Sequence, residues 1–182
     1  INEKTVYRYI NAGLLHSPKR GDMPRSCMIK PRQGKKPLEH KVDSKCRLGR
    51  TYQDYQLFIG ENPGVRVVEM DSVIGRIGGK VLFTMQFVSC GLMLAFLREH
   101  NDSQSVIDIF NMLWELLGPD LFRLLFPVLL TDNGSEFSNP AAIETAPDAQ
   151  TRSRVFYCDP CASWQKGHVE RNHEFLRLVR PK

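Results

Sequence analysis

The stretch Val65-Arg-Val-Val-Glu-Met-Asp71 decides the fold, because it is a short apolar run of β-branched residues that ends in an aspartate. Such a run favours a buried β-strand, and we expect one over 65–73. A second run of the same form, Pro127-Val-Leu-Leu-Thr-Asp132, predicts a buried strand over 127–131. Each strand would therefore deliver one carboxylate at its end.

A third carboxylate, Glu170, lies in a helix-compatible segment that follows Trp164-Gln-Lys-Gly167. Two strand ends and one helix can converge, so Asp71, Asp132 and Glu170 predict a metal-dependent phosphoryl-transfer site. Cleavage of a phosphodiester by water and attack by a DNA 3′-hydroxyl both use paired metal ions, and carboxylate oxygens are the hard ligands that suit Mg²⁺. Clustered carboxylates also repel one another until cations bind.

Each predicted ligand also has a plain structural interpretation. Asp71 can be a strand-end aspartate in a turn, and Asp132 can be the Asx-turn residue of Asp-Asn-Gly. Glu170 can be a solvated helix residue paired with Lys166 at i−4. Three neighbouring carboxylates could also replace them as ligands, namely Glu69, Glu136 and Glu174.

The core reads as strands first and helices after, with Gly78-Gly79 as the first hairpin turn. After the strand at 65–73 we expect strands over 80–89 and 91–99, a helix with Ser103 as N-cap and Gly118-Pro119 as stop, the strand at 127–131, a loop with Pro140 and Pro147, a strand over 154–157 and a helix over 165–179. This is the element order of the ribonuclease-H-like fold, an α/β fold whose mixed five-stranded sheet has helices on both faces. Its first and fourth strands are neighbours, so their carboxyl ends would bring Asp71 and Asp132 together.

The N-terminal part is of another kind. Residues 2–15 predict a short helix whose apolar stripe is Val6, Tyr7, Ile10 and Leu14. A second short helix, expected over 51–61, leads into the core. Since Ile1 leaves no room for the first helix of a helix-turn-helix, we expect 1–15 to be the remnant of such a DNA-binding region, or a helix that packs on the core.

Residues 16–50 are rich in Lys, Arg, Gly and Pro, which predicts an extended basic linker before a catalytic core over 51–182. The first 50 residues hold 13 Lys or Arg against 4 Asp or Glu, whereas the remainder holds 12 against 16. A basic arm on an acidic core favours a polyanion partner, because Lys and Arg near phosphates release condensed counterions. A merely solvated charge run is the alternative.

Length, hydropathy and cysteine usage bound the class of protein. The 182 residues suffice for one domain of moderate size, or one domain with an arm. No apolar run approaches the roughly 20 residues that cross a bilayer, and the first residues do not resemble a signal peptide. The 5 cysteines lack the spacing of a disulfide scaffold. We therefore expect a soluble protein of a reducing, cytoplasmic compartment without a membrane partner.

A zinc site is an alternative to the carboxylate site. Cys158-x-x-Cys161 followed by His168 and His173 could complete a tetrahedral shell of two thiolates and two imidazoles. Only one such cysteine pair is present, however, and both histidines fall in the segment expected to carry Glu170. The carboxylate site is therefore favoured.

A resemblance to a known superfamily makes this interpretation specific. Thr131-Asp-Asn-Gly-Ser-Glu-Phe137 resembles the Asp-Asn-Gly-x-Glu-Phe signature of retroviral integrases and bacterial DDE transposases. Val67-Val-Glu-Met-Asp71 and Ser163-Trp-Gln-Lys-Gly-His-Val-Glu-Arg-Asn-His173 are similar to its other two signatures. Nearly the whole chain is similar to the insertion-sequence transposases of the IS thirty family, from the Thr-Val-Tyr-Arg-type helix and basic linker to the Cys-Asp-Pro and Trp-Gln-x-Gly blocks.

The resemblance implies a catalytic core in which Asp71, Asp132 and Glu170 bind two Mg²⁺ or Mn²⁺ ions. Such enzymes cut at the ends of a mobile element and join them to target DNA, as homo-oligomers of at least two subunits on DNA, in the bacterial cytoplasm beside the nucleoid. One departure concerns the 37 residues between Asp132 and Glu170, slightly more than is usual in the superfamily. We place the insertion in the loop Glu144 to Arg152.

Residues expected to contact DNA phosphates lie in three segments, unless they form only exposed mixed-charge faces. They are Lys4, Thr5 and Arg8 of the first helix, Lys35 and Lys36 of the linker, and Lys166, Arg171 and Arg177 around Glu170. Trp164 is either a packing anchor or a base-stacking platform. Two other functions stay open: a DNA-binding or regulatory remnant that does not cut, and a structure-specific nuclease of the same fold that hydrolyses without joining.

Overall fold

The computed structural model describes residues 2–17, 45–75 and 79–179, without the side chains of Glu3 and of 174–179. The chain divides into two compact units, Ile1–Lys41 and Val42–Lys182. The expected turn at Gly78-Gly79 lies partly outside the described residues, as does most of the expected linker. Within the described part, no helix is both long enough and apolar enough to cross a membrane.

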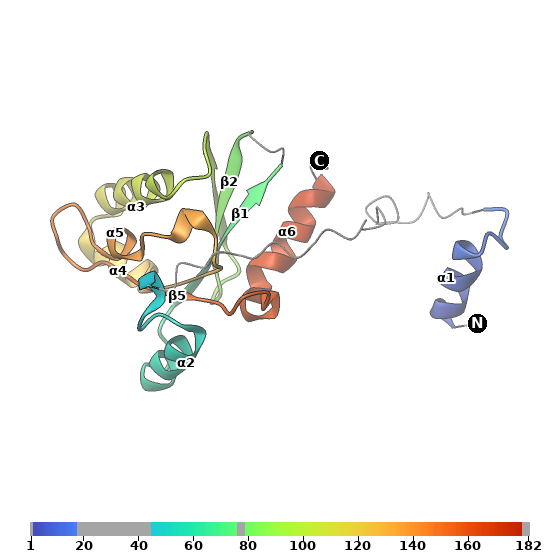
Figure 1. Cartoon of the computed structure of the whole chain (residues 1–182), viewed down its shortest axis with the longest axis horizontal. Coiled ribbons are helices and arrows are strands. Elements are labelled where there is room, and N and C mark those ends of the chain that lie inside the picture. The colour runs from blue at the N-terminus through green and yellow to red at the C-terminus, as the bar shows by residue number, and fades with distance from the viewer. Residues whose placement is uncertain (1, 18–44, 76–78, 180–182) are drawn as a thin grey trace. The chain divides into compact units, whose positions relative to one another are not determined.

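The second unit is built on one five-stranded mixed sheet (Figure 1). Its strands are β1 (Val67–Ile74), β2 (Val81–Phe87), β3 (Met93–Arg98), β4 (Val128–Thr131) and β5 (Arg154–Tyr157), in the spatial order β3-β2-β1-β4-β5. The first three strands form an antiparallel meander, while β4 lies parallel to β1 and to β5. The α/β class and the neighbouring first and fourth strands are confirmed, and the arrangement is compatible with the ribonuclease-H-like fold.

Helices cover both faces of this sheet. Figure 1 shows α3 (Ser103–Leu117), α4 (Pro119–Leu125) and α5 (Pro140–Glu144) on one side and α6 (Gly167–Val179) on the other. The element α2 (Tyr52–Glu61) begins at a capping box, in which Thr51 and Asp54 each bond the other's backbone N–H. Within its described residues, the unit also has three short 3-10 helices: η3 (Lys45–Arg47), η4 (Ser135–Phe137) and η5 (Ser163–Lys166).

Two details of α3 and α4 correct the sequence expectation. The N-cap of α3 is Asp102, whose side chain accepts from the Ser105 backbone N–H, so Ser103 is already the first helical residue. Gly118 ends α3 with φ of +75°, as expected. Pro119, however, does not end the helical region but begins α4 as its first residue, a position that suits proline because it needs no backbone N–H.

The face of the sheet beneath α3, α4 and α5 carries the main apolar core. Phe83 of β2 and Phe110 of α3 are fully buried, with ring centroids 6.3 Å apart in an edge-on arrangement. The helix α3 turns one apolar face to this core, since Val106, Ile107, Phe110, Leu113 and Trp114 are all buried and Leu117 is partly buried. Arg152 is buried against the same core and donates to the backbone carbonyls of Ile143 and Ala142 in α5.

On the opposite face, α2 covers β4 and β5 with aromatic side chains. Tyr55 and Phe58 of α2 each contact the ring of Phe156. Residues 45–50, expected to belong to the linker, lie along the outer edge of β5: the Arg50 carbonyl oxygen accepts from the Tyr157 backbone N–H, and the Arg50 side chain forms a two-bond ion pair with Glu144 of α5. The described residues 45–50 therefore pack beside β5.

The described part of the first unit contains α1 (Glu3–Asn11), which is shorter than the expected helix over 2–15. Asn2 is its N-cap and accepts from the Lys4 backbone N–H. Of the predicted apolar stripe only Ile10 is buried, while Val6, Tyr7 and Leu14 are exposed. Lys4 and Arg8 are exposed and Thr5 is half-buried, so the three predicted DNA contacts of α1 share a helix with an open surface.

Candidate active site

Strand alternation gives β1 and β2 a second, polar face. Glu69 and Asp71 alternate with the core residues Val68 and Met70 along β1, and the register pairs them with Gln86 and Thr84 of β2. Residues paired directly across antiparallel strands share one face, so the four side chains form a polar square. Glu69, Thr84 and Gln86 are buried.

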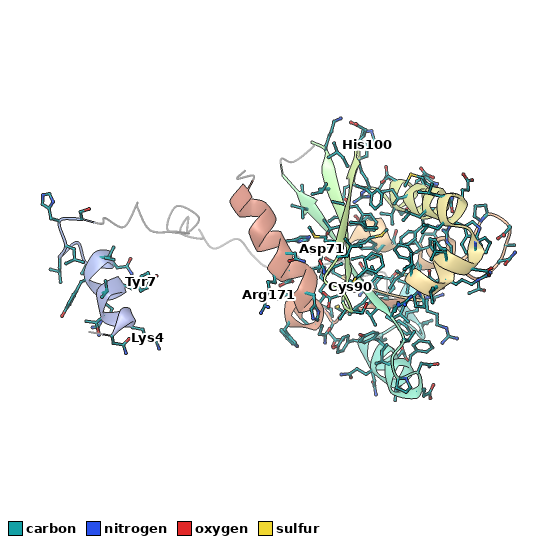
Figure 2. The ribbon with its side chains drawn as sticks, turned by 180° about the vertical axis from the view of Figure 1, so that it is seen from behind. Lys4, Tyr7, Asp71, Cys90, His100 and Arg171 are labelled. Atoms are coloured by element: carbon teal, nitrogen blue, oxygen red, sulfur yellow. The ribbon has the colours of Figure 1, made fainter. Side chains whose placement is uncertain are left out.

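The helix α6 covers this polar square. Lys166, the last residue of η5, is buried with the inward residues Val169 and His173 of α6, and the three recur at helical spacing. Figure 2 shows Asp71 between α6 and the sheet, with Arg171 on the outward side of the helix. The contacts between helix and sheet are polar: His168 Nδ1 to Glu69, the Val169 backbone N–H to Glu69, Asn172 to Gln86, and the His173 ring to Asp71 and Thr84.

Asp71 and Asp132 meet at the edge where β4 ends. The parallel register pairs Val67 with Val128 and Glu69 with Leu130, and its continuation places Asp71 level with Asp132. The structure therefore brings the two aspartates together as predicted, with one correction. Asp71 does not end its strand, because β1 continues to Ile74 as a two-stranded extension with β2 beyond the end of β4.

A single ammonium group joins the two aspartates. Lys166 Nζ lies 3.2 Å from Asp71 Oδ1 and 3.1 Å from Asp132 Oδ2. It also lies 3.5 Å from the Met70 carbonyl oxygen. The Lys166 side chain is only 5% exposed, so this cation is held inside the protein and not on its surface.

The charges at this point determine the protonation of the pair. Burial alone would lower the pKa of Lys166, but the carboxylates of Asp132 and Asp71 outweigh burial and raise its pKa above the ordinary value. Burial likewise acts to raise the pKa of Asp71, yet the hydrogen bond from His173 and the charge of Lys166 hold that pKa below its ordinary value. The lysine is thus a cation and Asp71 an anion at neutral pH.

The loop before α6 aims Lys166 at the aspartates. Gln165 of η5 braces this loop in two directions, accepting from the Asp159 backbone N–H at 2.7 Å and donating to the Asp159 carboxylate at 2.8 Å. The Cys158 backbone N–H donates to Thr131 at the end of β4. The loop and η5 are therefore fixed to the strand that carries Asp132, with Lys166 as the next residue.

Asp132 also forms the turn that the sequence predicted as its structural role. Its Oδ1 accepts from the Gly134 backbone N–H at 3.0 Å, while Oδ2 faces Lys166. A Cβ at Gly134 would stand 2.5 Å from Glu136 Oε2 and 3.1 Å from Asp132 Oδ1. Gly134 therefore lets the Glu136 carboxylate approach the turn, and Glu136 is buried there.

The rival carboxylates have different surroundings. Glu69 binds the first turn of α6 through two contacts of 2.8 Å, to the Val169 backbone N–H and to His168 Nδ1, a favourable place for a negative charge. Glu136 lies 3.5 Å from the Asn101 side chain on the other side of the Asp132 turn. The side chain of Glu174 lies outside the described residues. Glu69 is thus a structural residue of the helix contact, and Glu136 is the rival that lies beside Asp132.

Glu170 lies in the first turn of α6 and is half-buried. In the described part of the chain, no set of three or more His, Cys, Asp or Glu side chains is arranged to hold a metal ion. Glu170 therefore does not join Asp71 and Asp132 in this arrangement, in which Lys166 lies between them. Its role as third ligand stays a prediction.

The two cysteines and two histidines of the alternative zinc site do not face one another. His168 and His173 point to Glu69 and to Asp71 and Thr84, and not to the cysteines. Cys158 is buried, and burial raises the pKa of its thiol to about 12, which disfavours the thiolate that zinc requires. Cys161 is exposed.

The predicted DNA contacts are dispersed. Lys166 is buried between the aspartates, so it faces the acidic pair and not the surface. Arg171 is exposed on the outward side of α6. Lys35 and Lys36 lie outside the described residues, as does the side chain of Arg177. Trp164 of η5 is 76% exposed, which excludes the packing-anchor interpretation and leaves base stacking as the open one.

A scan against protein-family models finds no match, and no curated protein matches the chain. Among solved structures, the chain is similar to one chain of the simian T-cell lymphotropic virus intasome in complex with the PP2A regulatory subunit B56 gamma, at 16% identity and a TM-score of 0.45. The likeness covers 62% of this chain and 38% of that chain, so the present chain spans well under half of its length.

Sequence reasoning missed the roles of Lys166 and His173 beside the aspartates. It placed Lys166 among the DNA contacts and treated His173 only as a zinc ligand. The available signal was the spacing of Lys166, Val169 and His173, which puts two basic side chains on the apolar side of a helix. Buried basic groups need anionic partners, and the predicted aspartates were such partners.

Proposed function

We propose that this chain is a metal-dependent DNA transposase that cleaves phosphodiester bonds at the ends of a mobile element and transfers the strands to target DNA. The observation that carries the proposal is the pair Asp71 and Asp132. They come from neighbouring parallel strands, lie level in the sheet, and share one cation between their carboxylates. The likeness of the three acidic blocks to the DDE signatures favours transposition over other phosphoryl transfers.

The residues present fit divalent cations. Two carboxylates that already share an ammonium group offer hard oxygen donors to one point, which is what Mg²⁺ and Mn²⁺ require. Asp71 and Asp132 would hold the ions, with Glu170 or the neighbouring Glu136 as the third carboxylate. When bound, a metal pair would activate the attacking oxygen and stabilise the leaving oxygen.

The chain's own groups would position the nucleic acid around this pair. Arg171 on the outward side of α6 and the basic residues of α1 and the linker would bind phosphates without reading sequence. Trp164, exposed one residue before the Gln165 brace, could stack on an unpaired base at the cleavage point. Two element ends must be held together, so we propose that the active form contains at least two copies of the chain.

A strand-transfer assay tests the proposal. The purified chain is incubated with labelled element ends, target plasmid and Mn²⁺. A transposase gives joined product, and a structure-specific nuclease gives nicks alone. We expect Asp71→Asn and Asp132→Asn to reduce joining by more than the roughly 10–100-fold that loss of an outer-shell partner costs. Glu99→Gln, which changes an exposed carboxylate just after β3, should join like the wild type.

A second candidate function is favoured by one observation, the occupation of the aspartate pair by Lys166. A chain whose ligands are permanently satisfied by lysine would fold and bind DNA without cutting it. It would act as a regulatory remnant of a transposase. This candidate predicts DNA binding by the same chain with neither nicks nor joined product in the assay above.

A further inference from the structure

The position of Lys166 raises a question that the proposed function leaves open. Its ammonium lies 3.2 Å from one aspartate and 3.1 Å from the other, at the point that a shared metal ion would need. A buried ammonium and a divalent cation cannot both occupy the space between the same two carboxylates. Binding of metal ions at this pair therefore requires the Lys166 side chain to leave.

The surroundings hold Lys166 firmly between the two aspartates. Its side chain is 5% exposed and also faces the Met70 carbonyl oxygen. The reciprocal bonds between Gln165 and Asp159 fix the adjacent residue. Without the lysine, two carboxylates would face one another in a partly buried place, and their repulsion would destabilise the fold there.

We propose that Lys166 is an internal cation that holds Asp71 and Asp132 in position until metal ions displace it, an inference that rests on the proposed function. In this scheme Lys166 is a positioning residue in the metal-free chain. Its release removes the ammonium from the space between the aspartates, where Glu170, four residues further along the same helical segment, could then contribute its carboxylate. The released ammonium is free to bind a phosphate of DNA.

Competition between the ammonium and the metal predicts a specific change in affinity. Lys166→Met keeps an unbranched side chain of similar length in the buried place but removes its charge. An opposite charge a few ångströms away changes the cation affinity of a carboxylate site by roughly ten-fold or more, so Lys166→Met should bind Mn²⁺ at least about ten-fold more tightly than the wild type. Lys166→Arg keeps a competing cation and should bind Mn²⁺ as weakly as the wild type does.

Titration calorimetry with Mn²⁺ on the full chain measures these affinities. Lys80→Met is the matched control, since Lys80 forms an exposed ion pair with Glu99 where the hairpin of β2 and β3 begins and ends. It should leave the Mn²⁺ affinity unchanged. An equal affinity of Lys166→Met and the wild type overturns the role of Lys166 and leaves the proposed function intact. Absence of Mn²⁺ binding by every variant overturns the proposed function and, with it, this inference.

Chemical labelling of the wild-type chain tests the same point if Lys166→Met does not fold. An amine-reactive reagent is applied with and without Mn²⁺, and modification is located by mass spectrometry. We expect Lys166 to react slowly without metal and several-fold faster with it, while the exposed Lys80 reacts equally in both. Calorimetric binding of Mn²⁺ with Lys166 still protected would overturn the proposal.

Discussion

The two faces of the strands β1 and β2 differ in chemistry, although alternate residues of the same two strands form them. One face, beneath α3 and α4, is apolar, with Met70, Phe83 and Met85 fully buried in it. The other, beneath α6, is the square of Glu69, Asp71, Thr84 and Gln86, joined to the helix by hydrogen bonds and ion pairs.

One pair of strands can thus both hold the fold together and carry a cluster of charged groups. The two-residue period of a strand keeps the apolar and the charged side chains apart, because odd and even positions point to opposite faces. The apolar face gains free energy from burial of large rings. The polar face gains less, since its groups exchange water for protein partners, but its charges have fixed positions. We therefore expect stability to depend on the first face and metal binding on the second.

Truncation of the apolar face should have the largest effect on stability. Phe110 is fully buried and contacts the rings of Phe83, Phe122 and Phe126. Phe110→Ala should lower the free energy of unfolding by about 3–5 kcal/mol. Denaturant titration measures the change. Leu116 lies on the same helix but is 75% exposed, so Leu116→Ala should change the free energy of unfolding by no more than about 0.5 kcal/mol. Loss of Mn²⁺ binding by folded Phe110→Ala would break the separation of the two faces.

A smaller and more local effect is expected from the polar face. Glu69→Gln removes the charge that accepts from the Val169 backbone N–H and His168 at the start of α6. The cost should be about 1.5–3 kcal/mol, the usual contribution of hydrogen bonds to a charged group. Hydrogen exchange should show faster exchange in α6 while α3 is unchanged. Equal acceleration in both helices would mean that the faces are not independent.

The sequence predicted the apolar face well and the polar face only in part. Val65 to Asp71 and Pro127 to Asp132 are apolar runs, and their parallel neighbourhood follows from element order, so the approach of the two aspartates was predictable. The spacing of Lys166, Val169 and His173 signals a buried lysine, but its approach to the aspartates was not predictable, because that approach depends on a 3-10 turn and on the Gln165 brace. Pro119 was misread because a proline that stops one helix can begin the next.

The smallest effects should appear as pH dependence. Because the folded pKa of Asp71 is depressed, its stabilisation is present above the ordinary aspartate pKa of about 3.9 and is lost as pH falls towards the folded value. The folded pKa of Lys166 is raised, so its stabilisation is present below about pH 10.4 and is lost as pH rises through the folded value.

The unfolding free energy of the wild type should therefore fall at both ends of the pH range, in an acid limb because of Asp71 and in an alkaline limb because of Lys166. Asp71→Asn should flatten the acid limb, and Lys166→Met should flatten the alkaline limb. Lys80→Met is the control for the alkaline limb, since its ion pair is exposed. An acid limb that is as steep in Asp71→Asn as in the wild type would show that other carboxylates cause it.

The central claim is that Asp71 and Asp132 form one cation site on the polar face. The most direct test is a crystal of the chain soaked in Mn²⁺, with the ions located by anomalous scattering. We predict density between the Asp71 and Asp132 carboxylates, with the Lys166 side chain turned away from both. Ions bound only at Glu136 and Asn101, or no ion beside the two aspartates at a saturating Mn²⁺ concentration, would contradict the account.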